Sequence, residues 1–422
     1  MHSSDPKKPV PRRVKIKTIL PGLALCLTLA SCQGSDQNIS TLWTNIPGIL
    51  TFVDHFNASQ KEWQLIVDYR DDPGRALRTG PEPDLVIAKD LASSERKDQM
   101  SDLGFLFNSG SVSTDNLYRR ILTSGEQGGQ VRLLPLSFDL PVVIFSRSAL
   151  PDLPGFSLSP EELRDLNAKF NAGIKEDGRR LAFSPLWGNA GLQWLSIQGA
   201  AFHESFSGEL EWNSQSLNAA AKWLSEWPSP GRDAVKKFQK KYLISDVTSF
   251  LDSGRIQFYP STLAEFLSRP WDERKTLDFR YIENKGQLMA TDDVVWAGIP
   301  NRGSRLGAAR AFLRWFSQAQ VQAQVAHEAH AENPRLFGIA QGLSARADVN
   351  PLFAQDYLDL KGRLPAKDQL RFWNPLPPQW RTLKSAVLFP WITAKAPDGV
   401  SLKAALVKLR SQNSLRSVSG QP

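Results

Sequence analysis

The chain has 422 residues, enough for two or three domains of ordinary size. Its formal net charge is +8, but six of its 51 Lys and Arg residues and one of its 43 Asp and Glu residues lie within residues 1–31. The rest of the chain is therefore close to neutral, and its cations are spread out, so composition gives no electrostatic reason to expect nucleic-acid binding.

The N-terminal segment places cations first and apolar residues next. Lys and Arg residues from Lys7 to Lys17 precede a largely apolar run, which ends in the sequence Leu-Ala-Ser-Cys at residues 29–32. This order resembles a bacterial lipoprotein signal peptide covering residues 1–31, with Cys32 as the lipidated, palmitate-bearing residue. The apolar run is shorter than the roughly 20 residues that a membrane-spanning helix needs. An uncleaved signal anchor with an incidental cysteine is the alternative.

This resemblance implies an extracytoplasmic protein held on a bacterial membrane by lipid, with residues 32–39 as a tether. No later stretch approaches the length of a membrane span. Cys26 would leave with the signal, and Cys32 would carry the lipid. Since the chain has no other cysteine, we expect no disulfide, no thiolate zinc site and no cysteine nucleophile.

The first part of the mature chain predicts an α/β domain. Residues 40–44 form the first expected strand, and residues 47–57 place apolar side chains at helical spacing. Residues 63–69 predict a strand buried on both faces, and residues 84–88 predict a short buried strand after a turn. This order of strand, helix, strand and strand favours largely parallel pairing.

Two prolines divide the next apolar stretch, residues 132–146. Pro135 and Pro141 are incompatible with one continuous central strand, so we expect two extended pieces joined by a bend. Further along, Leu217, Ala220, Ala221 and Leu224 share one helical face.

The last elements are expected to be mostly helical. Residues 254–259 predict a strand, and residues 302–330 predict one long helix. Beyond Asn350 the sequence indicates helical pieces separated by proline clusters. The chain shows no internal repeat and no low-complexity tract.

Several of these segments together resemble the extracellular solute-binding proteins of ABC importers, the group that includes maltose-binding protein. The segments that carry the resemblance are 42–45 (LWTN) with the helix that follows, 83–87 (PDLVI), 134–146 (LPLSFDLPVVIFS), 292–300 (DDVVWAGIP) and 311–316 (AFLRWF). Their order and spacing, together with the lipoprotein start, make the match; no single piece is diagnostic.

The resemblance implies an α/β, two-lobe periplasmic-binding-protein-like (type II) fold with hinge strands between the lobes. The crossings between lobes would fall near 134–141, 294–300 and 335–342. Lobe one would comprise residues 40–137 plus 300–335, lobe two residues 142–293 plus 345–412, and residues 413–422 would form a flexible tail.

The expected ligand lies between the lobes, beyond the carboxyl ends of the strands. A sugar ring is recognised by aromatic faces and by neutral or acidic hydrogen-bonding groups. The candidate ligand-binding residues are Trp43, Thr44, Asn45, Asp90, Asp139, Trp187, Asn189, Tyr259 and Trp296. Asn45 could instead cap the helix after Pro47, Asp90 could lie in a solvated loop, and Trp296 could brace a hinge.

Motifs of catalysis and metal binding are not found. There is no nucleophile elbow, phosphate-binding loop or dinucleotide fingerprint. His327 and His330 lie three residues apart, unlike the four of a zincin helix, and no third ligand is evident. We therefore expect no catalytic residue, no cofactor and no metal.

The sequence thus predicts a monomeric, membrane-anchored receptor that is not an enzyme. It would capture a small solute, a sugar or oligosaccharide, by closure of its lobes and deliver it to the transmembrane subunits of an ABC importer. Two alternatives stay open. One is a secreted hydrolase acting on glycans, whose carboxylates can be far apart in sequence; the other is a sensor or surface lipoprotein with the same fold.

Overall fold

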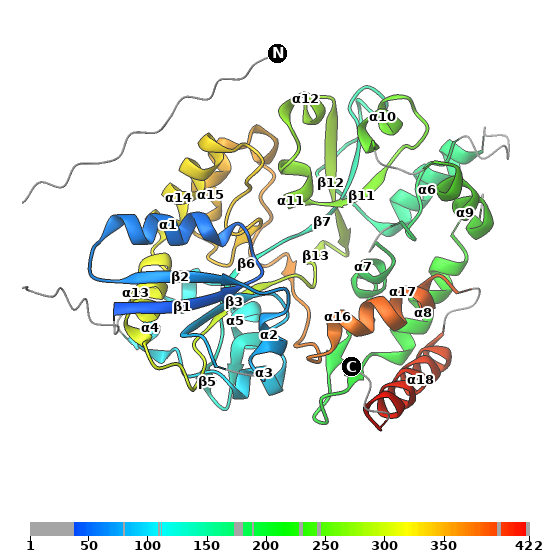
Figure 1. Cartoon of the computed structure of the whole chain (residues 1–422). Coiled ribbons are helices and arrows are strands. Elements are labelled where there is room, and N and C mark those ends of the chain that lie inside the picture. The colour runs from blue at the N-terminus through cyan, green and yellow to red at the C-terminus, as the bar shows by residue number, and fades with distance from the viewer. Residues whose placement is uncertain are drawn as a thin grey trace, which may run out of the picture. The chain divides into compact units, whose positions relative to one another are not determined.

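The computed structural model describes residues 38–418 apart from 79–80, 109, 111, 173–179, 188–189, 228–230, 243–245 and 395–397. The proposed signal peptide, Cys32 and Asn189 therefore lie outside the described residues. Among the described residues, no helix combines the length and apolarity needed to cross a bilayer. Two separate sheets organise the chain into two lobes (Figure 1).

The sheet of lobe one has the strand order β15-β6-β14-β3-β1-β2. Its strands are β1 (Ile39–Thr44), β2 (Gln64–Tyr69), β3 (Leu85–Ala88), β6 (Leu134–Phe138), β14 (Val295–Gly298) and β15 (Leu343–Ser344). β1 pairs in parallel with both β2 and β3, as the βαβ spacing predicts, whereas β14 runs antiparallel to β3 and β6. The parallel strands therefore end at one edge of this sheet.

The early strands lie where the sequence predicts them, but the burial predicted for residues 63–69 is wrong. β2 is the edge strand of the sheet, so it has a partner on one side only. Ile66 and Tyr69 are half exposed. Residues 64–69 therefore form an edge strand, and the side chain of its last residue, Tyr69, is accessible to solvent.

The sheet of lobe two has the strand order β11-β7-β12-β13-β16, with β8 pairing beside β12. Its strands are β7 (Pro141–Ser146), β8 (Ser157–Leu158), β11 (Tyr259–Thr262), β12 (Leu277–Asn284), β13 (Gln287–Met289) and β16 (Leu370–Arg371). Two small hairpins, β4–β5 (Glu126–Gln127 and Gln130–Val131) and β9–β10 (His203–Glu204 and Leu210–Glu211), lie outside the two sheets. The core strand β7 is buried throughout.

The chain passes between the sheets three times. β6 leads into β7 through Asp139 and Leu140, so the bend predicted between the two prolines is the first passage. β13 leads back into β14 through residues 290–294. β15 still belongs to the first sheet and β16 to the second, so the third passage begins after Ser344, later than predicted.

Helices cover the sheet of lobe one. They are α1 (Ile49–Ser59), α2 (Pro73–Ala76), α3 (Ser94–Asp98), α4 (Gly104–Asn108), α5 (Arg119–Gly125), α13 (Leu306–Phe316), α14 (Ala319–Glu332) and α15 (Asn350–Phe353). The single helix predicted for 302–330 is in fact two, α13 and α14. α13 ends because the Ser317 hydroxyl donates to the Leu313 carbonyl at 2.6 Å, while Arg346 Nη1 donates to the Ser317 carbonyl at 2.5 Å.

Lobe two carries most of the remaining helices. They are α6 (Pro160–Asn171), α7 (Ala190–Ile197), α8 (Ser214–Ser225), α9 (Gly231–Lys241), α10 (Val247–Asp252), α11 (Leu263–Leu267), α12 (Trp271–Arg274), α16 (Trp380–Leu383), η5 (Lys384–Leu388, a π-helix), α17 (Phe389–Ile392) and α18 (Gly399–Val418). The α8 face predicted from Leu217 to Leu224 is buried, which confirms it.

One predicted strand of this lobe has the wrong bounds. The strand predicted for 254–259 begins only at Tyr259, because Gln257 and Phe258 donate their backbone N–H groups to one carbonyl, that of Ala182, and so leave the regular ladder. Residues 413–418 of the predicted tail form the last turns of α18, which continues to Val418. Its Lys, Leu, Arg and Gln residues are good helix formers.

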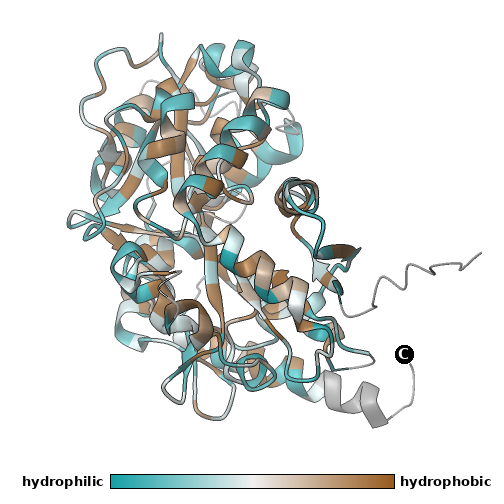
Figure 2. Cartoon of the chain, turned by 90° about the vertical axis from the view of Figure 1, so that its left-hand side faces the viewer, coloured by the Kyte–Doolittle hydropathy of each residue, from teal (hydrophilic) through white to brown (hydrophobic). Residues whose placement is uncertain are grey.

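Each lobe has its own apolar layer between sheet and helices. Figure 2 shows apolar residues concentrated on the strands, while the helices alternate apolar and polar faces. In lobe two the layer is rich in large rings: Trp194 packs against Trp223 with ring centroids 5.7 Å apart, and Trp223 packs against Trp227 at 4.9 Å. Most of the tryptophans therefore stabilise the lobes.

Candidate functional site

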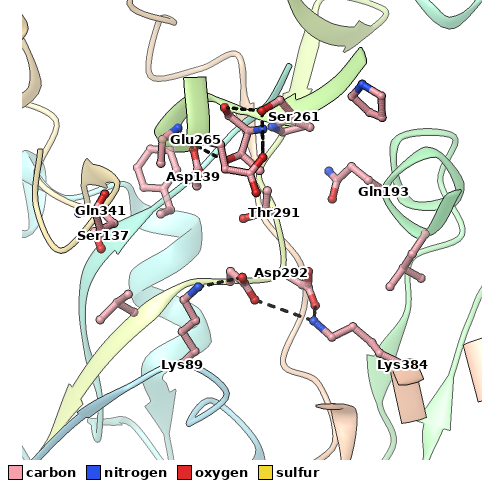
Figure 3. A pocket seen from close by; sticks show the side chains of 18 of the residues that line it. Lys89, Ser137, Asp139, Gln193, Ser261, Glu265, Thr291, Asp292, Gln341 and Lys384 are labelled. Carbon is pink, nitrogen blue, oxygen red and sulfur yellow. Dashed lines mark hydrogen bonds and ion pairs between the residues drawn. The ribbon is translucent and has the colours of Figure 1, made fainter. Parts of the chain in front are cut away.

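A cavity of about 930 Å³ lies between the two lobes. This volume is at the upper end of the range for small-molecule sites, about 300–1,000 Å³. Residues from both sheets, from the first and second passages, from the segment before β15 and from the helices of lobe two line it (Figure 3). The polar lining residues are Asn45, Tyr69, Asp71, Lys89, Asp90, Ser137, Asp139, Gln193, Tyr259, Ser261, Thr262, Glu265, Ser268, Thr291, Asp292, Asp293, Gln341, Arg381 and Lys384.

One end of the cavity carries two carboxylates, Asp139 and Glu265. Asp139 lies in the first passage and accepts hydrogen bonds from the backbone N–H groups of Leu140 at 2.8 Å and Ala264 at 3.1 Å. Glu265 belongs to α11 and accepts from the Ser261 hydroxyl at 2.9 Å and from the Thr262 N–H at 3.2 Å. The fold thus fixes one carboxylate from each of two neighbouring segments at the same end, as Figure 3 shows.

Burial raises the pKa of Asp139 to about 7. Its hydrogen bonds with Thr262, Ala264 and Leu140 lower the pKa only in part, and the nearby Glu265 charge raises it further. Asp139 can therefore be neutral or ionised near neutral pH, and it can donate or accept a hydrogen bond to a ligand accordingly.

This pKa shift predicts a specific pH dependence of stability. Between the ordinary aspartate pKa of 3.8 and about 7, folded Asp139 holds a proton that the unfolded chain has lost. The contribution of Asp139 to stability therefore falls as pH rises through this window. The free energy of unfolding of Asp139→Asn, taken relative to that of wild type, should therefore rise by about 2 kcal/mol between about pH 5 and about pH 7.

Urea unfolding of both proteins across this pH range measures the difference. All other titratable groups are the same in both proteins. The pH dependence of the difference in unfolding free energy therefore reports on Asp139 alone. A difference that stays constant with pH would show that Asp139 keeps an ordinary pKa in the folded protein.

The opposite end of the cavity carries a cluster of alternating charges. Lys384 Nζ lies 2.6 Å from Asp292 Oδ2 and 3.9 Å from Asp293 Oδ1, and Lys89 Nζ lies 2.9 Å from Asp293 Oδ2. Lys384 comes from η5 of lobe two, the aspartates from the second passage, and Lys89 from the end of β3 in lobe one. We call these four residues the bridging cluster, because they connect the two lobes.

The electrostatics of the bridging cluster are balanced. Burial would lower the pKa of Lys384, but Asp292 and Asp293 outweigh it and raise that pKa. Burial would raise the pKa of Asp293, but Lys89 and Lys384 outweigh it and lower that pKa. Asp90, which sits beside this cluster at the end of β3, has its pKa raised to about 6, chiefly by burial. Its backbone has φ of 61°, an uncommon conformation outside glycine.

The walls between the two ends offer neutral polar groups and rings. Gln193 of α7 and Thr291 of the second passage point toward the cavity in Figure 3. Tyr69, Tyr259 and Phe389 line it and are at least partly exposed, so their ring faces are available to a ligand. Exposed ring faces together with hydrogen-bonding groups suit a molecule with both apolar and polar surface.

Five of the predicted ligand-binding residues line the cavity: Asn45, Asp90, Asp139, Trp187 and Tyr259. Asn45 does not cap α1, whose N-cap is Gly48 with no side-chain hydrogen bond. Trp187 is only 1% exposed, because it stacks between Phe238 and Tyr259. The Trp187 ring therefore belongs to the wall of the cavity and supports Tyr259.

Three predicted residues lie away from this cavity. Trp43 and Thr44 are buried in lobe one, where Arg70 covers the Trp43 ring at 4.8 Å and the Thr44 hydroxyl accepts from the Ile46 N–H at 3.0 Å. Their side chains stabilise the end of β1 instead of reaching the cavity. Trp296 is also buried and borders a separate small cavity of about 40 Å³. Asn189 lies outside the described residues.

Sequence reasoning missed most of the lining of the second lobe. Glu265, Gln193, Asp292 and Lys384 all reach the cavity, yet none follows a recognisable motif. Asp292 and Asp293 had the clearest signal, since two carboxylates directly precede a predicted crossing strand. The others depend on how distant helices pack, which one sequence does not reveal.

The described residues hold no group of three or more His, Cys, Asp or Glu side chains arranged for a metal ion. His327 Nδ1 lies 2.9 Å from Asp356 Oδ1, and His330 Nδ1 lies 3.3 Å from the Leu336 carbonyl. Both histidines thus have partners within lobe one.

Comparison with known proteins relates the chain to sugar-binding proteins by structure. No protein-family model matches the sequence, and no curated protein matches it either. The sugar-binding protein MalE from Xanthomonas citri is similar in structure, with a TM-score of 0.67, 14% identity, and coverage of 91% of this chain and 100% of that one.

Two further structures are similar. One is an ABC substrate-binding protein from Listeria monocytogenes in complex with cycloalternan, with a TM-score of 0.59, 12% identity, and 91% and 99% of the two chains covered. The other is the galacto-N-biose-/lacto-N-biose I-binding protein of the Bifidobacterium longum ABC transporter in complex with lacto-N-biose, with a TM-score of 0.59, 12% identity, and coverage of 90% and 97%. The chain therefore has the two-lobe α/β fold of these solute-binding proteins.

Proposed function

We propose that the protein is an extracytoplasmic solute receptor, held on a bacterial membrane through Cys32, that captures a sugar or oligosaccharide and delivers it to an ABC importer. In this proposal the ligand enters the open cavity, and rotation about the three passages closes the lobes over it. The receptor binds without altering its ligand, and it acts as a monomer.

The observation that carries the proposal is the composition of the cavity between the lobes. Carboxylates, amides and hydroxyls from both lobes face the same space, with partly exposed tyrosine rings beside them. Sugars present hydroxyls around an apolar ring face, and such a mixed wall complements them. Because the groups come from both lobes, a bound sugar makes its full set of contacts only when the lobes are closed.

The similar structures support the same proposal. Those from Listeria monocytogenes and Bifidobacterium longum are described in complex with cycloalternan and lacto-N-biose. Both ligands are oligosaccharides, and the volume of about 930 Å³ leaves room for more than one sugar ring here.

Titration of the soluble protein from residue 33 onward with a panel of mono-, di- and trisaccharides tests this function. We expect saturable binding of at least one oligosaccharide by calorimetry, with a change in tryptophan fluorescence, since Trp187 and Trp194 line the cavity. The bound sugar should be recovered intact after long incubation. Cleavage of the sugar would favour the hydrolase, and binding of peptides or polyamines with no saccharide bound would overturn the proposal.

A further inference from the structure

The charges that line the cavity are unequally distributed. Six carboxylates face it: Asp71, Asp90, Asp139, Glu265, Asp292 and Asp293. Three cations face it, namely Lys89, Arg381 and Lys384. Both lysines belong to the bridging cluster, where Asp292 and Asp293 neutralise them at 2.6 and 2.9 Å. Once Asp90 and Asp139 are ionised, the cavity therefore has a surplus of negative charge, which disfavours ligands with acidic groups.

This surplus is concentrated at the end formed by Asp139 and Glu265. Glu265 is exposed to the cavity, and its hydrogen bonds come from Ser261 and the Thr262 backbone. Two arginines act on tyrosines near this end, Arg269 on Tyr259 and Arg363 on Tyr281. Arg269 is paired with Glu273 at 3.4 Å and Arg363 with Asp278 at 2.6 Å, and neither lines the cavity. Tyr281 faces Asp139 from β12 and is neutral, since burial raises its pKa. No described lining residue brings a positive charge to this end.

A second observation at the same wall points to a ligand. Trp187 lines the cavity, is 1% exposed, and its indole Nε1–H has no hydrogen-bond partner among the described residues. The Thr291 hydroxyl, which Figure 3 places between the two ends, likewise has no partner there. Both residues line the cavity, and a ligand oxygen that reaches this wall can supply the acceptor that these two donors lack. The donors of this wall thus complement hydroxyl or ring oxygens of a ligand, and the carboxylates of the adjacent end complement a positive charge.

We propose that the ligand is an amino sugar, or an oligosaccharide that contains one, whose free primary ammonium lies between Asp139 and Glu265. This inference rests on the proposed sugar-binding function and names its ligand class. An ammonium group relieves the repulsion between the two carboxylates and donates up to three hydrogen bonds. N-acetylation removes the charge and puts a bulkier neutral group at the same place. A neutral sugar hydroxyl would satisfy the oxygens without compensating their charge.

The test compares three probes of equal length by titration calorimetry: the β-1,4-linked disaccharide of glucosamine, its fully N-acetylated form, and cellobiose. Wild type should bind the glucosamine disaccharide about tenfold more tightly than cellobiose or the N-acetylated form, because charge-assisted hydrogen bonds are about twice as strong as neutral ones. This preference should shrink in high salt, which screens the attraction.

Two variants and a control locate the ammonium. Glu265→Gln keeps the α11 capping box, since glutamine serves at that position as well as glutamate, and Asp139→Asn keeps the shape of the side chain. Each should reduce the tenfold preference to about threefold or less, whereas Asp165→Asn, an exposed position on α6 of the same lobe, should leave it unchanged. Thermal unfolding of each variant confirms that it is folded.

The outcomes separate this inference from the proposed function. Tight binding of cellobiose with equal or weaker binding of the glucosamine disaccharide would overturn the amino-sugar inference and leave a sugar receptor standing. A preference that survives in both variants would overturn the placement at Asp139 and Glu265. Absence of binding by any saccharide in the wider panel would overturn the proposed function itself.

Discussion

Replacing Asp278 with asparagine should destabilise the protein by about 3–5 kcal/mol at neutral pH, the range for removal of one partner from a buried ion pair. Asp278 Oδ1 accepts from Arg363 Nη1 at 2.6 Å and Oδ2 accepts from Arg280 Nη1 at 2.8 Å. Arg147 lies 3.8 Å away and also contacts Asp359 at 3.0 Å. The variant leaves buried guanidinium groups without their counter-charge.

The Asp278 network also matters for the connection between lobes. Asp359 and Arg363 belong to the third passage, whereas Asp278 and Arg280 belong to β12, so the network fastens that passage to the sheet of lobe two. Loss of Asp278 should therefore loosen the passage as well as lower the free energy of unfolding.

The pH dependence of this effect has a definite sign. Burial alone would raise the pKa of Asp278, but the hydrogen bonds from Arg363 and Arg280 outweigh it and hold the pKa below its usual range. The stabilisation by Asp278 is therefore present above the ordinary aspartate pKa and is lost only as pH falls below it. Wild type and Asp278→Asn should converge under strongly acidic conditions.

Urea unfolding at neutral pH measures the cost. The matched control is Asp272→Asn, which removes an exposed aspartate paired with Lys275 at 2.9 Å and should leave the midpoint unchanged, since exposed pairs contribute little. Equal urea midpoints for Asp278→Asn and wild type would contradict this prediction, because they would show that the arginines form other ion pairs or hydrogen bonds in the variant.

The second large effect is expected from Lys384→Met, which should destabilise the protein by about 3 kcal/mol by leaving the second passage with unpaired carboxylates. Asp292 would retain the Trp380 Nε1–H, which lies 2.5 Å from its Oδ2, but would lose its cation. Asp90, whose pKa is already raised to about 6 and is lowered in part by Lys384, should become harder to ionise.

This variant should also bind sugar more weakly, because Lys384 links lobe two to the passage whose aspartates also hold Lys89 of lobe one. Removing the cation raises the pKa of Asp90 and Asp293, both of which Lys384 lowers in wild type, so protonation relieves the repulsion at lower pH. The destabilisation should accordingly be larger at about pH 8 than at about pH 5.

Arg381→Gln provides the control for Lys384→Met. Arg381 also lines the cavity, but it is exposed and donates only one hydrogen bond across it, at 3.1 Å to the Asp71 carbonyl. Its loss should cost little stability at any pH. A Lys384→Met protein with the same pH profile as Arg381→Gln would contradict the role given to the bridging cluster.

Local patterns predicted the lobe-one sheet well. Residues 84–88 contain a short apolar run after turn residues, and the helix between the first two strands has clear helical spacing. Pro135 and Pro141 placed the first passage correctly, because proline cannot sit within a continuous central strand. Burial of residues 63–69 was wrong because the place of a strand in its sheet is a tertiary property.

Breaks within helices and the start of β11 escaped prediction for a similar reason. The end of α13 at Ser317 depends on Arg346, which lies 29 residues further along the chain. The site was predictable where a candidate ends a strand or lies in a passage, as Asp90 and Asp139 do. It was not predictable where a side chain comes from a helix of the other lobe, as Glu265, Gln193 and Lys384 do.

Small-angle X-ray scattering with and without a saturating sugar tests lobe closure most directly. The sugar used is one that calorimetry has already shown to bind. We expect the radius of gyration to fall on binding and to return when the sugar is removed, since the two lobes rotate about the three passages to enclose it. An unchanged scattering profile at saturation would contradict closure of the two lobes around the ligand.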